Sequence, residues 1–147
     1  MIPHASHAVA LLAQRMLTAL LPEQATTFAA ADVSLLGLLL QMVGQDFERA
    51  AQARVADIRE MREIFAEARR LSLGETLRAQ MEKAIAGDLS DLRITALDEL
   101  HAQHSAALIA LHARVEESEE ADAARLDRLV WHYLERHAER HRYDVDF

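Results

Sequence analysis

The chain has 147 residues, with 16 lysines and arginines against 24 aspartates and glutamates, a formal net charge of −8 and no cysteine. A hydrophobic fraction of 51% excludes an intrinsically disordered chain, and the lack of cysteine excludes disulfides and thiolate chemistry. The negative charge argues against nucleic acid or an anionic membrane as partner. We expect one soluble, cytoplasmic domain over residues 1–147, because no signal-peptide pattern is recognised and the longest apolar run, Val33 to Val43, is about half of what spans a bilayer.

The composition predicts an all-α fold. The chain contains 2 prolines and 4 glycines, so it has few residues that favour turns. No segment alternates apolar and polar residues as a half-buried strand does. We therefore expect an elongated bundle of about five helices, with one very long second helix and a C-terminal antiparallel helix hairpin.

The first two helices differ greatly in predicted length. The first is expected from about His4 to Leu21, where a proline follows. The second is expected to begin at Asp32 as its N-cap and to continue without a breaking residue to about Leu71. At 1.5 Å per residue this helix is roughly 60 Å long. It must therefore bend, for example near Gly44, or belong to an elongated bundle.

Two further helices are predicted from capping residues. Ser72 followed by Glu75 has the spacing of a capping box and opens a third helix, which is expected to end at Gly87. Asp88 or Ser90 then caps a fourth helix. Each of these short polar side chains can accept a hydrogen bond from the free backbone N–H groups at a helix start.

A helix hairpin is predicted at the C-terminal end. The fourth helix is expected to end at about Glu117, and a fifth runs from about Ala123 to Arg142. The acidic connection between them is short, and helices joined by a short connection pack antiparallel. The sequence contains no repeat and no long linker, so we predict a single helical unit.

The first half of the long second helix is apolar on nearly every side. Such a helix needs to be covered all round, and two interpretations remain open. A second copy of the chain covers it, which predicts a homodimer, or the other helices of one chain surround it. The residues assigned to the interface in the first case are Leu35, Leu36, Leu39, Leu40 and Val43.

Histidines are the unusual chemical feature of the sequence. At about 100° per residue, His101 and His104 share one face of the fourth helix, and His137 and His141 extend the apolar face of the fifth. The hairpin register places the two pairs at one level, with Asp98 beside them. Histidine pairs at i,i+3 and i,i+4 on facing helices can hold Zn, Fe, Ni or Cu. Alternatively, these histidines bond nearby acids or favour a helix C-terminus by their charge.

Other chemistries find little support. No glycine-rich phosphate loop is present, and no serine lies in the setting of a catalytic triad. Arg54 falls within the apolar stripe of the second helix, where an interior arginine usually has a carboxylate partner. Two interpretations remain open: it binds an acidic ligand, or it extends past alanines to the surface or pairs across an oligomer interface.

We therefore expect a non-enzymatic interaction or structural protein that self-associates, with a further protein as a possible partner. Metal binding through the histidine cluster is the alternative. Binding of a small apolar ligand among the leucines of the second helix is the third hypothesis.

Overall fold

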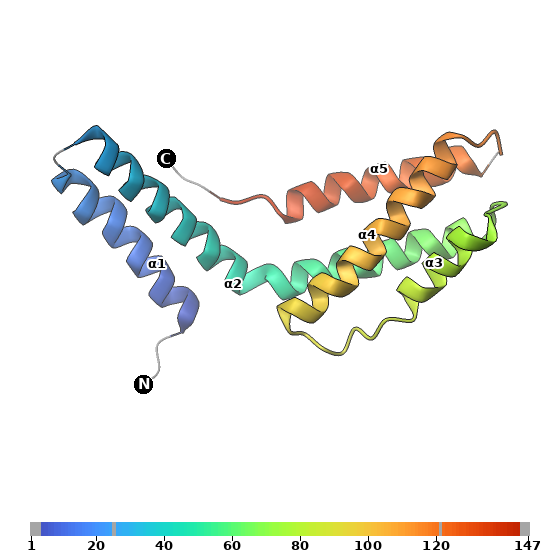
Figure 1. The fold of residues 1–147 in the computed structure, drawn as a ribbon, viewed down its shortest axis with the longest axis horizontal. Coiled ribbons are helices and arrows are strands. Elements are labelled where there is room, and N and C mark those ends of the chain that lie inside the picture. Colours follow the sequence, from blue (N-terminus) through green and yellow to red (C-terminus); the bar gives the residue numbers. More distant parts are fainter. Residues whose placement is uncertain (1–3, 25, 121, 145–147) are drawn as a thin grey trace. The chain divides into compact units, whose positions relative to one another are not determined.

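The computed structural model describes residues 4–24, 26–120 and 122–144. These residues form five α-helices and no strand, which confirms the predicted all-α fold and the very long second helix (Figure 1). The helices are α1 (Ala5–Arg15), α2 (Thr27–Ala68), α3 (Glu75–Ile85), α4 (Ile94–Glu116) and α5 (Ala123–Arg140).

The contacts of the chain divide into two compact units. Unit 1 includes the described residues up to Ala50 together with Tyr143 and Asp144, and unit 2 runs from Ala51 to Arg142. Helix α2 contributes its first half to unit 1 and its second half to unit 2. Because α2 runs through this boundary, the sequence shows no break there.

In unit 1, α1 continues into a π-helical turn at Met16–Leu20 and a short 3-10 turn at Leu21–Glu23, so the first predicted helix is confirmed. The predicted start of the second helix is wrong. Helix α2 begins at Thr27, five residues before Asp32, because the Ala29 N–H donates to Thr26 Oγ1 at 3.2 Å and satisfies a free backbone donor.

Two glycines bring α1 and α2 together in unit 1. A Cβ atom built on Gly37 would lie 2.7 Å from the Leu17 side chain, and one built on Gly44 would lie 3.6 Å from Val9. The absence of a side chain at Gly37 therefore permits the close approach of Leu17.

The chain returns to unit 1 after α5. The Tyr143 hydroxyl donates to Asp46 Oδ2 at 2.8 Å. The Gln45 amide donates to the Asp144 carbonyl at 2.6 Å and accepts from the Asp144 N–H at 3.0 Å. These bonds attach residues 143 and 144 to α2.

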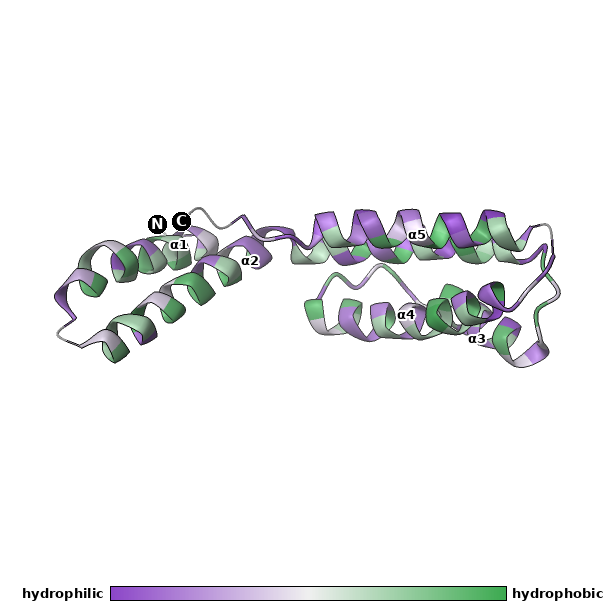
Figure 2. Cartoon of the chain, turned by 90° about the horizontal axis from the view of Figure 1, so that it is seen from above, coloured by the Kyte–Doolittle hydropathy of each residue, from purple (hydrophilic) through white to green (hydrophobic). Residues whose placement is uncertain are grey.

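Much of the apolar surface of unit 1 is exposed. Hydrophobic residues occur on several sides of α1 and of the first half of α2 (Figure 2). By length and composition alone, α2 could cross a membrane. Core helices of soluble proteins can meet the same criterion, but such helices are mostly buried, whereas only 6% of the most apolar 18-residue window of α2 is buried.

Unit 2 contains the main hydrophobic core. The second half of α2, α3, α4 and α5 each contribute buried side chains to it. Phe65, Ile58 and Met61 of α2 are fully buried together with Leu97 and Leu111 of α4. His101 lies against His137 and His112 against Asp127, so α4 and α5 run antiparallel.

The predicted caps of α3 and α4 do not form. Helix α3 begins at Glu75, because the Ser72 N–H donates to Glu120 across the unit at 3.3 Å instead of joining a capping box. Ser90 donates its N–H to Asp88 at 2.9 Å within the loop, and α4 starts later, at Ile94. Helix α5 begins at the predicted residue and ends two residues early, at Arg140.

Candidate metal centre

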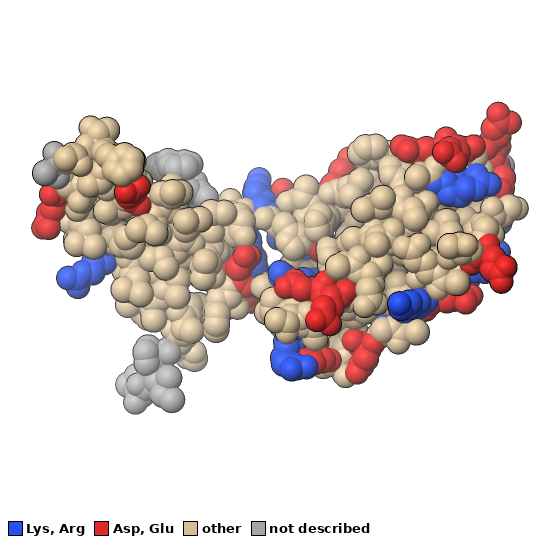
Figure 3. Space-filling model, in the orientation of Figure 1, with Lys and Arg blue, Asp and Glu red and all other residues tan. Residues whose placement is uncertain are grey.

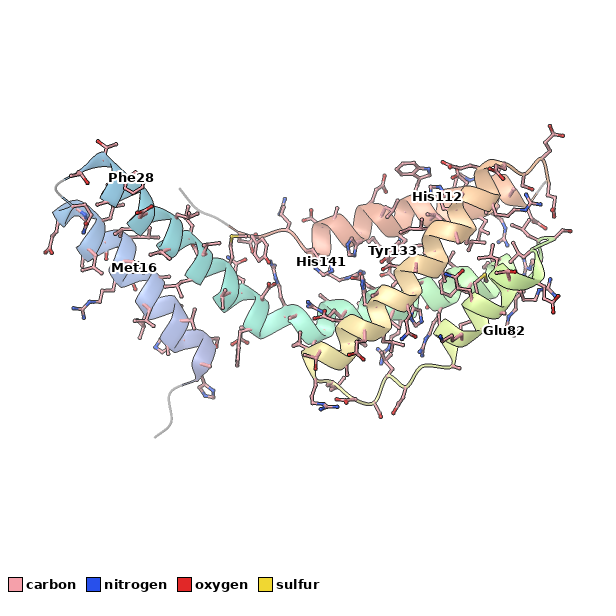
Figure 4. The ribbon with its side chains drawn as sticks, in the orientation of Figure 1. Met16, Phe28, Glu82, His112, Tyr133 and His141 are labelled. Carbon is pink, nitrogen blue, oxygen red and sulfur yellow. The ribbon has the colours of Figure 1, made fainter. Side chains whose placement is uncertain are left out.

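Asp57 is a fully buried carboxylate on α2, within unit 2. His137 Nδ1 donates to its Oδ2 at 2.9 Å, and His141 Nε2 donates to the same oxygen at 2.7 Å. Arg140 bonds the other oxygen, Oδ1. His141 directly follows the last residue of α5, and Tyr133 lies on the same helix (Figure 4). The end of α5 therefore directs three of its side chains at one carboxylate of α2.

His101 on α4 completes the group. Its Nε2 lies 3.3 Å from Asp57 Oδ2 but is buried and makes no hydrogen bond with any described residue. Its Nδ1 lies 3.4 Å from Ser105 Oγ, and its ring stacks on that of His137 with centroids 5.9 Å apart. The tautomer protonated on Nδ1 donates to Ser105 and has a free Nε2 lone pair, whereas the tautomer protonated on Nε2 directs its N–H at Asp57 Oδ2.

The spacing of these donor atoms fits a metal ion. One ligand atom each from Asp57, His101 and His137 lies within 4.8 Å of the other two. Ligands bound to tetrahedral zinc at 2.0–2.1 Å are about 3.3 to 3.4 Å apart. The His101–Asp57 distance of 3.3 Å already matches, and the His137–Asp57 distance of 2.9 Å needs to open by less than about 1 Å.

The surroundings keep the carboxylate charged. Burial alone would raise the pKa of Asp57, but the imidazoles of His101 and His141 and the positive charge of His137 and Arg140 outweigh it, so the pKa lies well below its usual range. Burial, together with the negative charge of Asp57, raises the pKa of Tyr133 above its ordinary value. Tyr133 therefore stays a neutral phenol at physiological pH.

A second layer of charge holds Arg140 in place. Arg140 bonds Glu60 Oε1 as well as Asp57, and Arg136 donates to Glu60 Oε2 at 3.0 Å. Arg140 thereby fixes Oδ1 of Asp57 and leaves Oδ2 directed at the three imidazoles. Such outer partners orient the ligands of metal sites.

The structure brings together three of the five residues that the sequence assigned to a metal site, namely His101, His137 and His141. His104 lies elsewhere, since its Nδ1 donates to the Leu100 carbonyl at 2.8 Å and its Nε2 accepts from Arg62 at 3.2 Å. Both ring nitrogens are thus engaged, and burial lowers the pKa of His104.

Asp98 forms an ion pair instead of joining the cluster. Its Oδ1 accepts a hydrogen bond from the guanidinium of Arg54, the residue for which the sequence suggested an acidic ligand. The Asp98 side chain is about half exposed, and its ion pair is with Arg54. The structure therefore places Asp98 and Arg54 in an ion pair on neighbouring helices.

Asp57 is the member of the cluster that sequence reasoning missed, although a signal for it exists. At about 100° per residue it falls on the same face of α2 as Met61 and Ile64, which are both buried. An acidic residue on a buried face requires partners. The histidines of α4 and α5 are the groups that supply them.

A cleft of about 740 Å³ lies in unit 1. Its lining includes Leu17 of the π-helical turn after α1. It includes none of the leucines of the second helix that were proposed to bind an apolar ligand. Its lining residues are Ser6, His7, Ala10, Ala13, Gln14, Leu17, Thr18, Gln41, Gly44, Gln45, Glu48, Arg49 and Asp144. The exposed surface of this lining is mostly apolar, so binding of a small apolar ligand stays a prediction for this cleft.

Comparison with known proteins found no match. No family model, no curated protein and no solved structure matches the chain. Function is therefore inferred from the geometry of the described residues.

Proposed function

We propose that this protein binds a transition-metal ion in unit 2 through Asp57, His101 and His137, with His141 as a fourth ligand. The observation that carries the proposal is the buried Nε2 of His101. This nitrogen lies 3.3 Å from Asp57 Oδ2 without a well-formed hydrogen bond to a described residue. Buried polar atoms in such a position are rare in folded proteins, and a bound ion is one explanation for them. A metal ion beside Asp57 Oδ2 would satisfy this nitrogen, and binding would displace the protons that His137 Nδ1 and His141 Nε2 donate to that oxygen in the metal-free protein.

The types of donor atom favour particular metals. Imidazole nitrogen suits Zn²⁺, Ni²⁺, Cu²⁺ and Fe²⁺, whereas Ca²⁺ and Mg²⁺ prefer sites made of oxygen atoms. Three histidines and one aspartate therefore favour the first group. The absence of cysteine removes the soft thiolate ligands on which copper(I) and iron–sulfur sites depend.

The burial of the ligands differs in a way that suits a metal centre. Asp57 is fully buried, whereas the side chains of His137 and His141 are each about one-third exposed. The ion would therefore be held from the core side by the carboxylate and approached from solvent on the imidazole side. A position open to water is what separates catalytic from purely structural zinc sites.

Metal titration of the full, tag-free chain tests the proposal. After dialysis against EDTA, we expect Zn²⁺ or Co²⁺ to bind with a stoichiometry of about one per chain. Co²⁺ reports its geometry through the visible absorption of a tetrahedral complex. Because His101 is a ligand, His101→Ala should weaken binding by more than about 100-fold.

A matched control is available on α5. His132 is exposed, and its imidazole contacts Glu135 at the surface instead of Asp57. His132→Ala should leave both stoichiometry and affinity unchanged. Metal uptake well below one equivalent, or uptake that His101→Ala does not weaken, would show that the cluster is a network of hydrogen bonds around Asp57 and nothing more.

A further inference from the structure

An apolar stripe, interrupted only by Asp32 among the described residues of this face, runs along the exposed side of α2 in unit 1. Phe28, Leu35, Leu39 and Val43 recur at intervals of seven and four residues, and each is between 46% and 79% exposed. Such spacing places side chains on one face of a helix, as in the seam between two packed helices. These four residues are called the α2 stripe below.

The α2 stripe lies opposite the part of α2 that α1 already covers. Gly37 and Gly44 contact Leu17 and Val9 of the first helical segment. At about 100° per residue, both glycines fall about 180° from Phe28. Helix α1 therefore cannot cover the stripe from its present position. Figure 3 shows few charged side chains on the visible face of unit 1.

Two charged residues argue against a lipid bilayer as the occupant. The contacts of Gly37 and Gly44 set the register of the two helices, so the exposed Arg15 is level with Leu39, at the middle of the apolar half. An arginine at the bilayer centre costs at least about 2.5 to 3.5 kcal/mol. Asp32, also exposed, lies on the stripe itself. A protein partner leaves Arg15 in water, whereas a bilayer does not.

The area of the stripe matches what a dimer needs. Leu36 and Phe47, which flank the stripe, are also more than half exposed. With about 200 Å² for each large apolar side chain, these six residues leave roughly 700 Å² open per copy. A standard stable interface buries about 800 Å² per partner. Apart from Asp32 near one end, the surface is apolar along its length, and such a surface can pair with itself about a two-fold axis.

We propose that two copies of this chain associate through the α2 stripe, burying stripe against stripe to form an isologous homodimer. The proposal is independent of the metal centre, because every residue of the stripe belongs to unit 1 and every proposed ligand to unit 2. Association should therefore persist in EDTA.

Sedimentation equilibrium of the full chain in EDTA tests the proposal. We expect a mass of twice 16.5 kDa. Leu39→Glu places a charge in the middle of the buried seam and should raise the dissociation constant by about 100-fold or more. Ile109→Glu is the matched control, since Ile109 is an exposed aliphatic residue on α4 in unit 2 and its substitution should not change association.

Cysteine cross-linking gives a second readout, because the chain has no cysteine of its own. Residues near a two-fold axis meet their own copies. In a series of single substitutions Leu35→Cys, Leu39→Cys and Val43→Cys, at least one should form a disulfide-linked dimer on mild oxidation, whereas Ile109→Cys should not.

Three results would overturn the proposal. The first is a monomer at a protein concentration of about 100 µM, which is far above the dissociation constant expected for an interface of this size. The second is a dimer that Leu39→Glu leaves intact while circular dichroism shows a folded protein. The third is flotation of the chain with phosphatidylcholine and phosphatidylglycerol vesicles that Leu39→Glu abolishes, which would assign the stripe to a membrane.

Discussion

Replacing Asp57 with asparagine tests how the buried carboxylate contributes to stability without metal. The substitution removes the negative charge but keeps the size and shape of the side chain. In EDTA a neutral amide at position 57 then lies against His137, His141 and Arg140. The contacts that the carboxylate makes with these groups are therefore weakened or lost.

The size of the effect follows from the burial of the cluster. Removing one partner of a buried ion pair costs about 3 to 5 kcal/mol, because the other charge is left uncompensated. Arg140 keeps its bond to Glu60 and its side chain is partly exposed, so the lower end of this range applies. We expect a loss of about 3 kcal/mol in the free energy of unfolding.

Urea unfolding followed by circular dichroism at pH 7.5 in EDTA measures this loss. Asp98→Asn is the control, because Asp98 forms a half-exposed ion pair with Arg54, and it should cost about 1 kcal/mol or less. A loss below about 1 kcal/mol for Asp57→Asn, or a gain in stability, would refute the electrostatic description of the cluster.

The same comparison has a defined pH dependence. The folded-state pKa of Asp57 is lowered, so its contribution is fully present above the unfolded pKa of about 3.9 and is lost as the pH falls through the lower folded value. The difference in stability between the wild-type protein and Asp57→Asn should therefore shrink as the pH falls below about 4. A difference that grows instead would contradict the direction of the shift.

Three further predictions concern the rest of the chain. Phe65→Ala removes a fully buried ring stacked on His104 and should cost about 3 to 5 kcal/mol in urea unfolding; a cost near zero would mean that the site collapses. The folded-state pKa of His104 is lowered, so below about pH 6.5 the unfolded chain binds more protons than the folded protein. The free energy of unfolding should therefore fall by at most about 1.4 kcal/mol per pH unit there, and by less in His104→Gln. Equal melting curves from pH 7.5 to 5.5 would contradict this. Tyr143→Phe removes the hydrogen bond to Asp46 and should cost about 0.5 to 1.5 kcal/mol, visible as faster C-terminal proteolysis; unchanged cleavage would show that this bond does not hold the segment.

The helices were predictable to the extent that local signals determine them. Helix α5 begins where the sequence indicated, because an acidic connection and an amphipathic pattern meet there. The start of α2 was not predictable, because Thr26 and Asp32 both have side chains that cap helices. The alanines between them fit a helix or a loop equally well. Ser72 failed as a cap because its N–H finds Glu120, 48 residues away, which no local pattern reveals.

The candidate metal centre was predictable in part for a related reason. His101 and His137 were placed together by the short connection between α4 and α5, which restricts the register of a hairpin. The prediction placed both histidine pairs at one level, but in the structure His101 stacks on His137 while His104 bonds Leu100 and Arg62 instead. Asp57 was out of reach, because it precedes His101 by 44 residues and His137 by 80, and periodicity does not determine how α2 lies against the hairpin.

Anomalous X-ray scattering from crystals grown with zinc shows directly whether an ion binds beside Asp57. We expect one strong peak at the zinc edge, about 2.0 to 2.1 Å from Asp57 Oδ2, His101 Nε2 and His137 Nδ1. Density without a peak in this cluster, or a peak bound only at surface residues, would contradict it.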